Sequence, residues 1–275
     1  DKVRAYYNDL GYLDAQVAAP VRVSDGKGRV NILFNVTEGP LYRIGTQRVT
    51  GVTHYSPDLV MSKSELPQTG SVAGAKTLAD AAHRVMVTVG SGDSGLADTR
   101  VDVQRIPRGD DPHTVDVVYV VTEGVPVVIN DVVIEGNDYT KDKVVRREIA
   151  LGPGDRMLED RAERSQKRLE NLDYFTRVRY SLRPTDRGKD ATGAEYRDLV
   201  YEVEEKNTGS FMIGLGASSV DSIYLSAELS QANFDLFAPG KWFRGAGQKG
   251  RVYAQVGPRI QTYEAAVTEP HLFDR

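Results

Sequence analysis

The sequence contains no cysteine and no long hydrophobic run. Without cysteine, it has no disulfide framework, no thiolate metal site and no thiol nucleophile. A transmembrane helix needs about 20 mostly apolar residues in succession, and no stretch approaches that length. Transmembrane β-strands are not excluded in this way, because each strand gives a much weaker hydropathy signal than a helix does.

The chain also has little excess of charge of either sign. The 275 residues include 35 basic and 39 acidic side chains, which leaves a formal net charge of −4. A nucleic-acid-binding protein is expected to carry a basic face or stripe, so the composition argues against a nucleic-acid partner. Hydrophobic residues make up 40% of the chain and charged residues 27%, as in folded rather than disordered proteins.

No group of residues has the composition or spacing of a catalytic or metal site. The four histidines lie far apart in different predicted elements: His54, His83, His113 and His271. The motif Gly214-Leu215-Gly216 falls within a predicted strand, whereas a nucleotide-binding glycine loop opens a helix. The charged run at 202–206 is interpreted as a solvated strand face. We therefore predict no catalytic residues, no metal, no cofactor, and a protein that is not an enzyme.

An internal repeat of about 85 residues organises the first three quarters of the chain. Val36-Thr37-Glu38-Gly39 recurs as Val121-Thr122-Glu123-Gly124, and Thr50-Gly51-Val52 recurs at the same shift as Glu135-Gly136-Asn137. A third, more diverged copy contains Val203-Glu204-Glu205-Lys206. Several motifs that share one period are poorly explained by chance.

Each copy has the same predicted order of elements, β-α-α-β-β, with two helices packed on one face of a three-stranded sheet. Opening strands are predicted at 41–49 and 127–135, and closing strands alternate apolar and polar residues at 30–36 and 115–121. Apolar or small residues at helical spacing indicate the buried helix faces: Leu78, Ala82, Val85 and Val89 in the middle copy, and Leu158, Ala162, Ser165, Leu169 and Leu172 in the last.

The first copy lacks its opening strand and its first helix. Residues 1–40 are therefore expected to be the C-terminal half of a domain, so that the chain starts inside a domain. Complete domains are predicted at 41–125 and 126–206.

From Gly209 onward, alternation with a period of two replaces the helical signal. Four stretches of roughly ten residues each present one apolar face and one polar or small face, as membrane-barrel strands do. Single-chain bacterial barrels begin at about eight strands, so four strands cannot close one. If these stretches are barrel strands, residues 207–275 are the first four strands of an incomplete transmembrane β-barrel. Periodicity alone equally allows a soluble antiparallel sheet with one solvated face.

The junction between the repeats and these strands carries the most specific pattern, Val203-Glu204-Glu205-Lys206-Asn207-Thr208-Gly209-Ser210-Phe211, followed by Gly214-Leu215-Gly216. Glu135-Gly136-Asn137-Asp138 and Arg146-Arg147-Glu148 precede it in the last repeat. Together these motifs resemble the barrel-proximal POTRA domain and the first barrel strand of the BamA family, bacterial outer-membrane β-barrel assembly factors. The resemblance covers essentially the whole chain, in order. It implies an α+β fold of tandem POTRA domains followed by strands of an incomplete transmembrane barrel.

The resemblance also implies a function, a location and partners. The protein is expected to assemble and insert β-barrel proteins into the outer membrane, with its POTRA domains in the periplasm. Its expected partners are unfolded outer-membrane proteins, lipoproteins of the assembly machinery and outer-membrane lipid. One departure from the family is the segment 233–247, which is longer and more aromatic than the short periplasmic turn expected there.

Exposed strand edges are the predicted binding sites, because an edge can pair with an unfolded chain by β-augmentation. The second strand of each complete POTRA domain is expected to bind substrate through these residues: Arg100, Val101, Asp102 and Val103, and Arg177, Val178, Arg179 and Tyr180. By resemblance to the family, the first barrel strand is expected to be a movable gate edge and template, formed by Gly209, Ser210, Phe211, Met212, Ile213, Gly214, Leu215 and Gly216.

The glycines of the predicted gate strand have two interpretations. Glycine weakens a strand interior, so Gly209, Gly214 and Gly216 would keep the strand weakly held. Alternatively, they provide packing room inside the barrel, and the sequence does not decide between the two. Proline at position 212 or 214 is expected to remove ladder donors and to block insertion.

Two other functions are compatible with the sequence. A related superfamily member would translocate proteins or assemble autotransporters, and the number of POTRA units before Asp1 would help to distinguish it. A soluble POTRA scaffold would use its C-terminal strands as a small sheet. Detergent dependence of residues 209–275, with the natural C-terminus restored, would distinguish that scaffold from a membrane protein.

Overall fold

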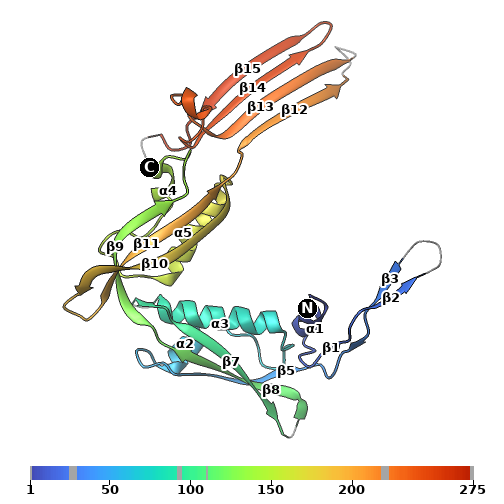
Figure 1. The fold of residues 1–275 in the computed structure, drawn as a ribbon, viewed down its shortest axis with the longest axis vertical. Helices are drawn as coiled ribbons and strands as arrows, with labels where there is room; N and C mark the ends of the chain where they lie inside the picture. The colour runs from blue at the N-terminus through green and yellow to red at the C-terminus, as the bar shows by residue number, and fades with distance from the viewer. Residues whose placement is uncertain (1, 25–29, 92–94, 110, 218–222, 273–275) are drawn as a thin grey trace. The chain divides into compact units, whose positions relative to one another are not determined.

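The computed structural model describes residues 2–24, 30–91, 95–109, 111–217 and 223–272 (Figure 1). Its internal contacts divide the chain into two compact units. The first consists of Asp1–Val127 and Arg156–Asp160, and the second of Val128–Asp155 and Arg161–Arg275. No helix in the described ranges is long and apolar enough to cross a membrane.

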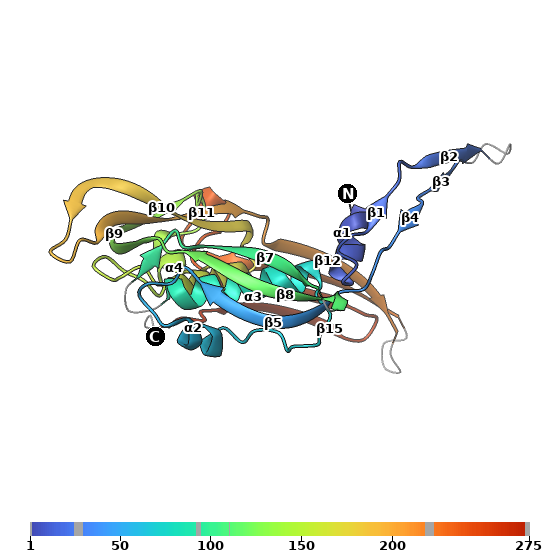
Figure 2. The same ribbon diagram turned by 90° about the horizontal axis from the view of Figure 1, so that it is seen from below.

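The first unit begins with helix α1 (Lys2–Asp9), followed by a β-ribbon of two short antiparallel ladders (Figure 2). The ladders pair β1 (Gln16–Val17) with β4 (Val36–Thr37), and β2 (Val21–Ser24) with β3 (Val30–Leu33). The prediction of a single strand over 30–36 is therefore wrong. Pro20 lies opposite the break, and proline has no N–H to donate to a ladder.

A three-stranded sheet with two helices completes most of the first unit. Its elements are β5 (Arg43–Thr50), α2 (Pro57–Lys63), α3 (Ala75–Gly90), β7 (Arg100–Arg108) and β8 (Asp111–Thr122). The strand order is β5-β8-β7, with β5 parallel and β7 antiparallel to the central β8. This is the β-α-α-β-β order predicted from the repeat.

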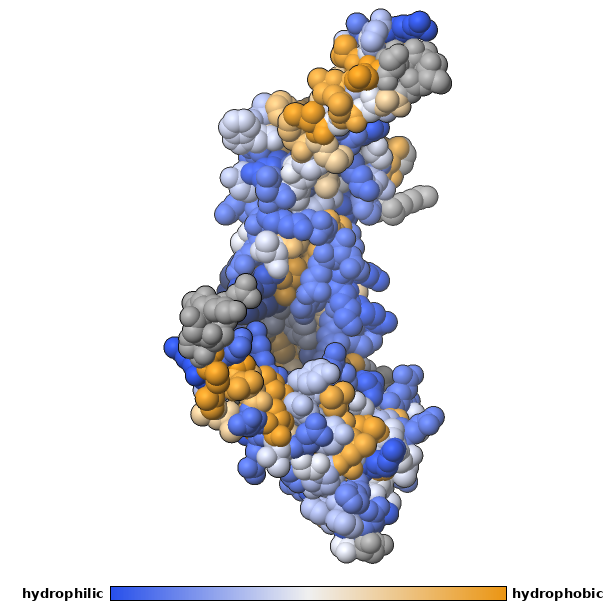
Figure 3. Space-filling model, turned by 90° about the vertical axis from the view of Figure 1, so that its right-hand side faces the viewer, coloured by the Kyte–Doolittle hydropathy of each residue, from blue (hydrophilic) through white to orange (hydrophobic). Residues whose placement is uncertain are grey.

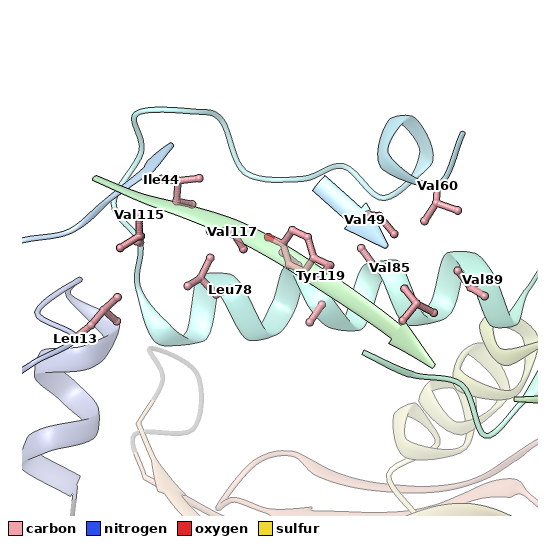
Figure 4. Close-up of a cluster of buried hydrophobic side chains, with 14 of the residues drawn as sticks. Leu13, Ile44, Val49, Val60, Leu78, Val85, Val89, Val115, Val117 and Tyr119 are labelled. Atoms are coloured by element: carbon pink, nitrogen blue, oxygen red, sulfur yellow. The ribbon is translucent and has the colours of Figure 1, made fainter. Parts of the chain in front are cut away.

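The core of this unit lies between α3 and the sheet (Figure 4). All four residues of the predicted helix face are buried, namely Leu78, Ala82, Val85 and Val89. They pack with inward-facing residues of β5 and β8, which include Ile44, Val49, Val115, Val117 and Tyr119. The hydroxyl of the fully buried Tyr119 donates a hydrogen bond to Gln47 Oε1 at 3.2 Å. Period-two alternation along β8 therefore selects the residues that meet the helix.

A second α/β layer of the same type follows. Its elements are β9 (Val125–Glu135), α4 (Asp142–Arg146), α5 (Glu159–Asn171), β10 (Phe175–Lys189) and β11 (Glu195–Glu205). The strand order is β10-β11-β9, and the short β6 (Leu96–Ala97) pairs with the first residues of β9. The buried helix face predicted for this copy is confirmed for its three central residues. Ala162, Ser165 and Leu169 are the buried residues of α5.

Both sheets contain the same close contact between a glycine and a facing strand. Gly51 has a φ of +83°, and a Cβ there would lie 2.1 Å from Val121 O. Gly136 has a φ of +89°, and its Cβ would lie 2.1 Å from Val203 O. Side chains are disfavoured at such positive φ values, so only glycine satisfies both the conformation and the approach. The repeated motif around these glycines thus corresponds to a repeated backbone geometry.

A carboxylate at the end of the last strand fixes the loop after the first strand in each copy. Glu123 Oε1 accepts hydrogen bonds from Thr53 N at 2.7 Å and His54 N at 3.1 Å. Its Oε2 accepts from Thr53 Oγ1 and lies 2.7 Å from His54 Nδ1. Burial raises the pKa of Glu123, but the hydrogen bonds from Thr53 and His54 outweigh it and lower the pKa to about 2.

Glu205 has the equivalent position in the last copy. Its Oε1 accepts from Thr140 N at 2.7 Å, and its Oε2 accepts from Tyr139 N at 2.9 Å. The interpretation of the charged run 202–206 as a solvated strand face is therefore wrong for Glu205, whose carboxylate binds two backbone N–H groups. That interpretation fits Glu204, which is exposed and pairs with Arg177 at 2.8 Å.

The depressed pKa of Glu123 predicts acid sensitivity of the first unit. A carboxyl whose pKa is lower in the folded state stabilises the fold above its unfolded pKa of about 4.5, and this stabilisation is lost as pH falls toward about 2. Glu123→Gln should cost about 2 kcal/mol at neutral pH, since hydrogen bonds to a charged group are lost. Urea unfolding at several pH values measures the free energy of unfolding. As pH falls through this window, that free energy should decrease less in the variant than in the wild-type protein. An equal decrease in both proteins would contradict the assignment.

A four-stranded antiparallel sheet ends the described part of the chain. Its strands are β12 (Gly209–Gly216), β13 (Tyr224–Phe234), β14 (Gln248–Val256) and β15 (Gln261–Thr268), in that order. A 3₁₀ turn, η1 (Pro239–Lys241), lies in the connection between β13 and β14. The four strands lie in the stretches where the alternation predicts them.

Candidate strand-binding edges

The four-stranded sheet has one apolar face. Its register aligns the apolar residues in rows across the strands: Phe211, Leu229, Val252 and Ala265; Ile213, Ala227, Ala254 and Tyr263; and Leu215, Leu225 and Val256. The large side chains of these rows are exposed, up to 78% for Leu215. Figure 3 shows hydrophobic residues gathered over the part of the molecule that this sheet forms.

The opposite face of the sheet is polar. The guanidinium of Arg251 donates to Glu228 Oε2 at 2.9 Å and to Glu264 Oε1 at 3.3 Å, which links three strands. The hydroxyls of Ser210 and Ser230 lie 2.7 Å apart on the same face. An ion-paired face of this kind suits contact with water, whereas the apolar face does not.

Strand β12 occupies one end of this sheet, so only one of its two edges is paired within the described ranges. Thr208 O accepts a hydrogen bond from Ala232 N at 3.1 Å, just before the first paired residue of β12. Hydrogen-bonded and non-hydrogen-bonded pairs alternate along an antiparallel ladder. The residues that bond to β13 are therefore Ser210, Met212, Gly214 and Gly216. The backbone groups of Gly209, Phe211, Ile213 and Leu215 point to the open edge.

This alternation changes the choice of proline positions. Proline at 212 or 214 would remove donors to β13 and weaken the sheet itself. Proline at 211, 213 or 215 would remove a donor from the open edge. The sequence showed which side chains share a face, but the direction of each N–H depends on how β12 pairs with β13.

The glycines of β12 lie beneath side chains of β13. A Cβ on Gly214 would lie 2.8 Å from Ser226 Oγ, and one on Gly216 would lie 2.4 Å from the ring of Tyr224. These contacts support the packing-room interpretation for both positions. The ladder between β12 and β13 runs without a register shift from Gly209 to Gly216.

The two POTRA strands predicted to bind substrate lie at sheet edges. Arg100, Val101, Asp102 and Val103 lie in β7, at one end of the order β5-β8-β7. Arg177, Val178, Arg179 and Tyr180 lie in β10, at one end of its own sheet. Val178 is 3% exposed, so its side chain packs into the core. At that residue, the edge offers backbone groups rather than a side chain.

The described ranges contain no group of three or more His, Asp and Glu residues placed to hold a metal ion. His54, whose Nδ1 lies 2.7 Å from Glu123 Oε2, belongs to the structural contact with Glu123.

The segment 233–247 has a docking role that the sequence did not reveal. Asp235 is 1% exposed, and its Oδ2 lies 2.5 Å from Lys141 Nζ. Asn233 is also buried; its Nδ2 donates to Thr140 Oγ1 at 2.8 Å, and its Oδ1 accepts from Gly247 N at 2.8 Å. The backbone N–H of Lys141 donates to Gly245 O at 2.8 Å. Length and aromatic content marked the segment as unusual, but its partner lies more than 90 residues away.

Comparison with known proteins shows which proteins this chain is similar to. A family model described as POTRA, surface antigen variable number repeat, matches residues 1–39 and 127–206. The outer membrane protein assembly factor BamA of Nitratidesulfovibrio vulgaris is 28% identical over 280 residues, which cover 99% of this chain and 32% of that protein. BamA of Neisseria meningitidis serogroup B is 28% identical over 242 residues, covering 88% of this chain and 29% of that protein. The chain thus spans about a third of the length of these relatives.

The fold is similar to the crystal structure of BamA from Haemophilus ducreyi lacking POTRA domains 1–3. The TM-score is 0.64 at 22% identity, and the match covers 85% of this chain and 41% of that one. Because residues 1–206 make up three quarters of the chain, the match must include part of residues 207–275. These findings confirm the predicted resemblance and the predicted fold class, tandem POTRA domains followed by the antiparallel strands of an incomplete barrel.

Proposed function

We propose that this BamA-like, POTRA-containing chain takes part in assembling β-barrel proteins into the outer membrane. The observation that carries the proposal is the open edge of β12, at the end of a sheet with one apolar and one polar face. The names of the relatives support the same role. Since the chain spans about a third of their length, the proposal concerns what this segment contributes.

An unfolded barrel protein brings unpaired backbone groups to a membrane, and lipid cannot satisfy them. The outward-pointing groups of Gly209, Phe211, Ile213 and Leu215 would pair with an incoming substrate strand. The strand would then enter the bilayer with its ladder already formed on one side. In this arrangement the apolar face contacts lipid, and the face that carries Arg251 lines the barrel interior.

The POTRA edges would act earlier, in the periplasm. Strands β7 and β10 each offer an edge to which an extended segment can add by β-augmentation, in which main-chain hydrogen bonds supply the affinity. Such binding is tolerant of sequence, as a receptor for many different unfolded outer-membrane proteins requires. Lipoproteins of the assembly machinery are further proposed partners of this POTRA region.

Reconstitution tests the proposed function. The full-length protein that carries this segment is placed in phospholipid vesicles, and an unfolded barrel protein is added from urea. Folding is followed by the altered electrophoretic mobility of unheated barrels. We expect faster folding than in vesicles that hold an unrelated barrel protein at the same lipid ratio. Equal rates in the two preparations would contradict the proposal.

A further inference from the structure

We infer that the segment 233–247 is a membrane-interface anchor, whose aromatic side chains enter the headgroup region of a phospholipid bilayer beside the four-stranded sheet. The inference rests on the proposed function in one respect, namely that the apolar face of this sheet contacts lipid. The anchor itself is a separate property, because it concerns the connection between β13 and β14 and not the open edge.

The segment exposes large aromatic side chains. Phe237 is 85% exposed, and Trp242, the one tryptophan of the sequence, is 82% exposed. Trp242 and Phe243 have φ values of +57° and +54°, a region that bulky residues rarely adopt. Hydrogen bonds from Trp242 N to Pro239 O and from Phe243 N to Ala238 O hold this strained turn. The exposure of Trp242 is therefore imposed by a defined backbone geometry.

The other side of the segment is fixed to the last POTRA domain. Besides the ion pair of the buried Asp235 with Lys141, Lys241 Nζ donates to Asp138 O at 2.6 Å. The guanidinium of Arg244 lies over the ring of Tyr139, 4.1 Å from its centroid. These contacts use the polar groups of the segment, whereas Phe237 and Trp242 stay outside them. The segment thus has one docked side and one exposed aromatic side.

The aromatic side continues the apolar face of the sheet. The rings of Phe234 and Phe243 are stacked, with centroids 6.0 Å apart. The Phe234 ring lies 2.9 Å from where a Cβ of Gly250 would be, and Gly250 shares its face of β14 with the apolar Val252. An open hollow of about 680 Å³ is lined by Leu229, Phe234, Trp242 and Phe243, among others. Apolar side chains of the sheet and of the segment therefore line one hollow that reaches Trp242, together with the polar residues Asn207, Ser230, Gln231 and Arg244.

The charges around these aromatics favour lipid headgroups as the occupant. The single acidic residue in the stretch 233–249 is Asp235, which is buried and paired. The exposed charged side chains of this stretch are those of Lys241 and Lys249. Lys249 lies on the Arg251 face of β14, whereas Lys241, which also bonds to Asp138 O, directly precedes Trp242. A tryptophan beside a basic residue is typical of membrane interfaces, where the ring lies at headgroup depth. A soluble partner would not require the aromatic surface to be continuous with a lipid-facing sheet.

Depth-dependent quenching tests the anchor. The full-length protein is reconstituted in phosphatidylcholine vesicles whose acyl chains carry bromine either near the glycerol end or near the methyl end. The contribution of Trp242 is the difference in emission between the wild-type protein and Trp242→Phe. We expect a large loss of this emission with shallow bromine and a smaller loss with deep bromine. Leu215→Trp in the Trp242→Phe background reports the apolar face of the sheet and should be quenched by deep bromine.

The possible outcomes separate the anchor from the proposed function. Quenching at position 215 without quenching of Trp242 would overturn the anchor and leave the membrane sheet intact. A blue-shifted but unquenched Trp242 would show burial against protein, and would overturn it as well. Absence of quenching at both positions would overturn the membrane sheet together with the anchor.

Discussion

Ile213→Pro is expected to slow barrel assembly strongly while leaving the sheet folded. Its N–H points to the open edge of β12, where proline is tolerated because no ladder donor is lost. A substrate strand would then meet a missing donor, and an unsatisfied backbone group in lipid costs several kcal/mol. Since about 1.4 kcal/mol corresponds to a factor of ten in rate, the rate of assembly in the reconstituted vesicles should fall about tenfold or more.

Ile213→Ala is the matched control for this change. It removes the same side chain but retains the N–H, and it should assemble substrate at close to the wild-type rate. If the proline variant worked as well as the alanine variant, the outward-pointing donor at 213 would have no part in assembly. Met212→Pro has a different expected effect, because it breaks the bond to β13 and should lower the stability of the sheet itself.

Gly136→Ala is expected to be strongly destabilising to the last POTRA domain. The residue would have to adopt a φ of +89° with its Cβ 2.1 Å from Val203 O. The left-handed backbone alone costs about 1–2 kcal/mol for a residue with a side chain. The overlap must also displace the strand that carries Val203, so the total loss should be about 3 kcal/mol or more. Urea unfolding with an optical probe of the whole protein measures this loss.

Gly154→Ala separates the two causes of that destabilisation. Gly154 has a φ of +90°, and a Cβ there would meet no atom within 4 Å. It should therefore show the conformational cost without the overlap. Similar losses for Gly136→Ala and Gly154→Ala would show that the contact with Val203 is unimportant. The pair Gly51→Ala and Gly70→Ala offers the same comparison in the first unit, where Gly70 has a φ of +86° and open space around it.

The repeat made most of the fold predictable. Local periodicity located β8, α3 and the strands of the four-stranded sheet, because each of them buries or exposes one regular face. The same periodicity gave a wrong prediction over 30–36, where the alternation of apolar and polar residues is unbroken. The strand is interrupted there because the segment that faces it contains Pro20. Pairing partners, and not the pattern within one segment, decided where that ladder breaks.

The functional edges were only partly predictable. Alternation identifies the apolar side chains of β12 but does not say whether the N–H of residue 212 or 213 faces outward. That property follows from the hydrogen bond between Ala232 and Thr208. The role of Glu205 could have been found from its alignment with Glu123 in the repeat. The docking of the segment 233–247 could not, because Asp235 and Lys141 meet through tertiary structure alone.

The central claim is that the open edge of β12 pairs with substrate strands, and disulfide cross-linking tests it most directly. The sequence has no cysteine, so each variant introduces one thiol into this segment. Ile213→Cys places it at the open edge, and Ala227→Cys places it in the same row of the sheet but between β12 and β14. With a barrel protein that carries one cysteine in a terminal strand and is arrested during assembly, the account predicts cross-linking to position 213 and not to 227. Absence of cross-linking at 213, or equal cross-linking at both positions, would contradict it.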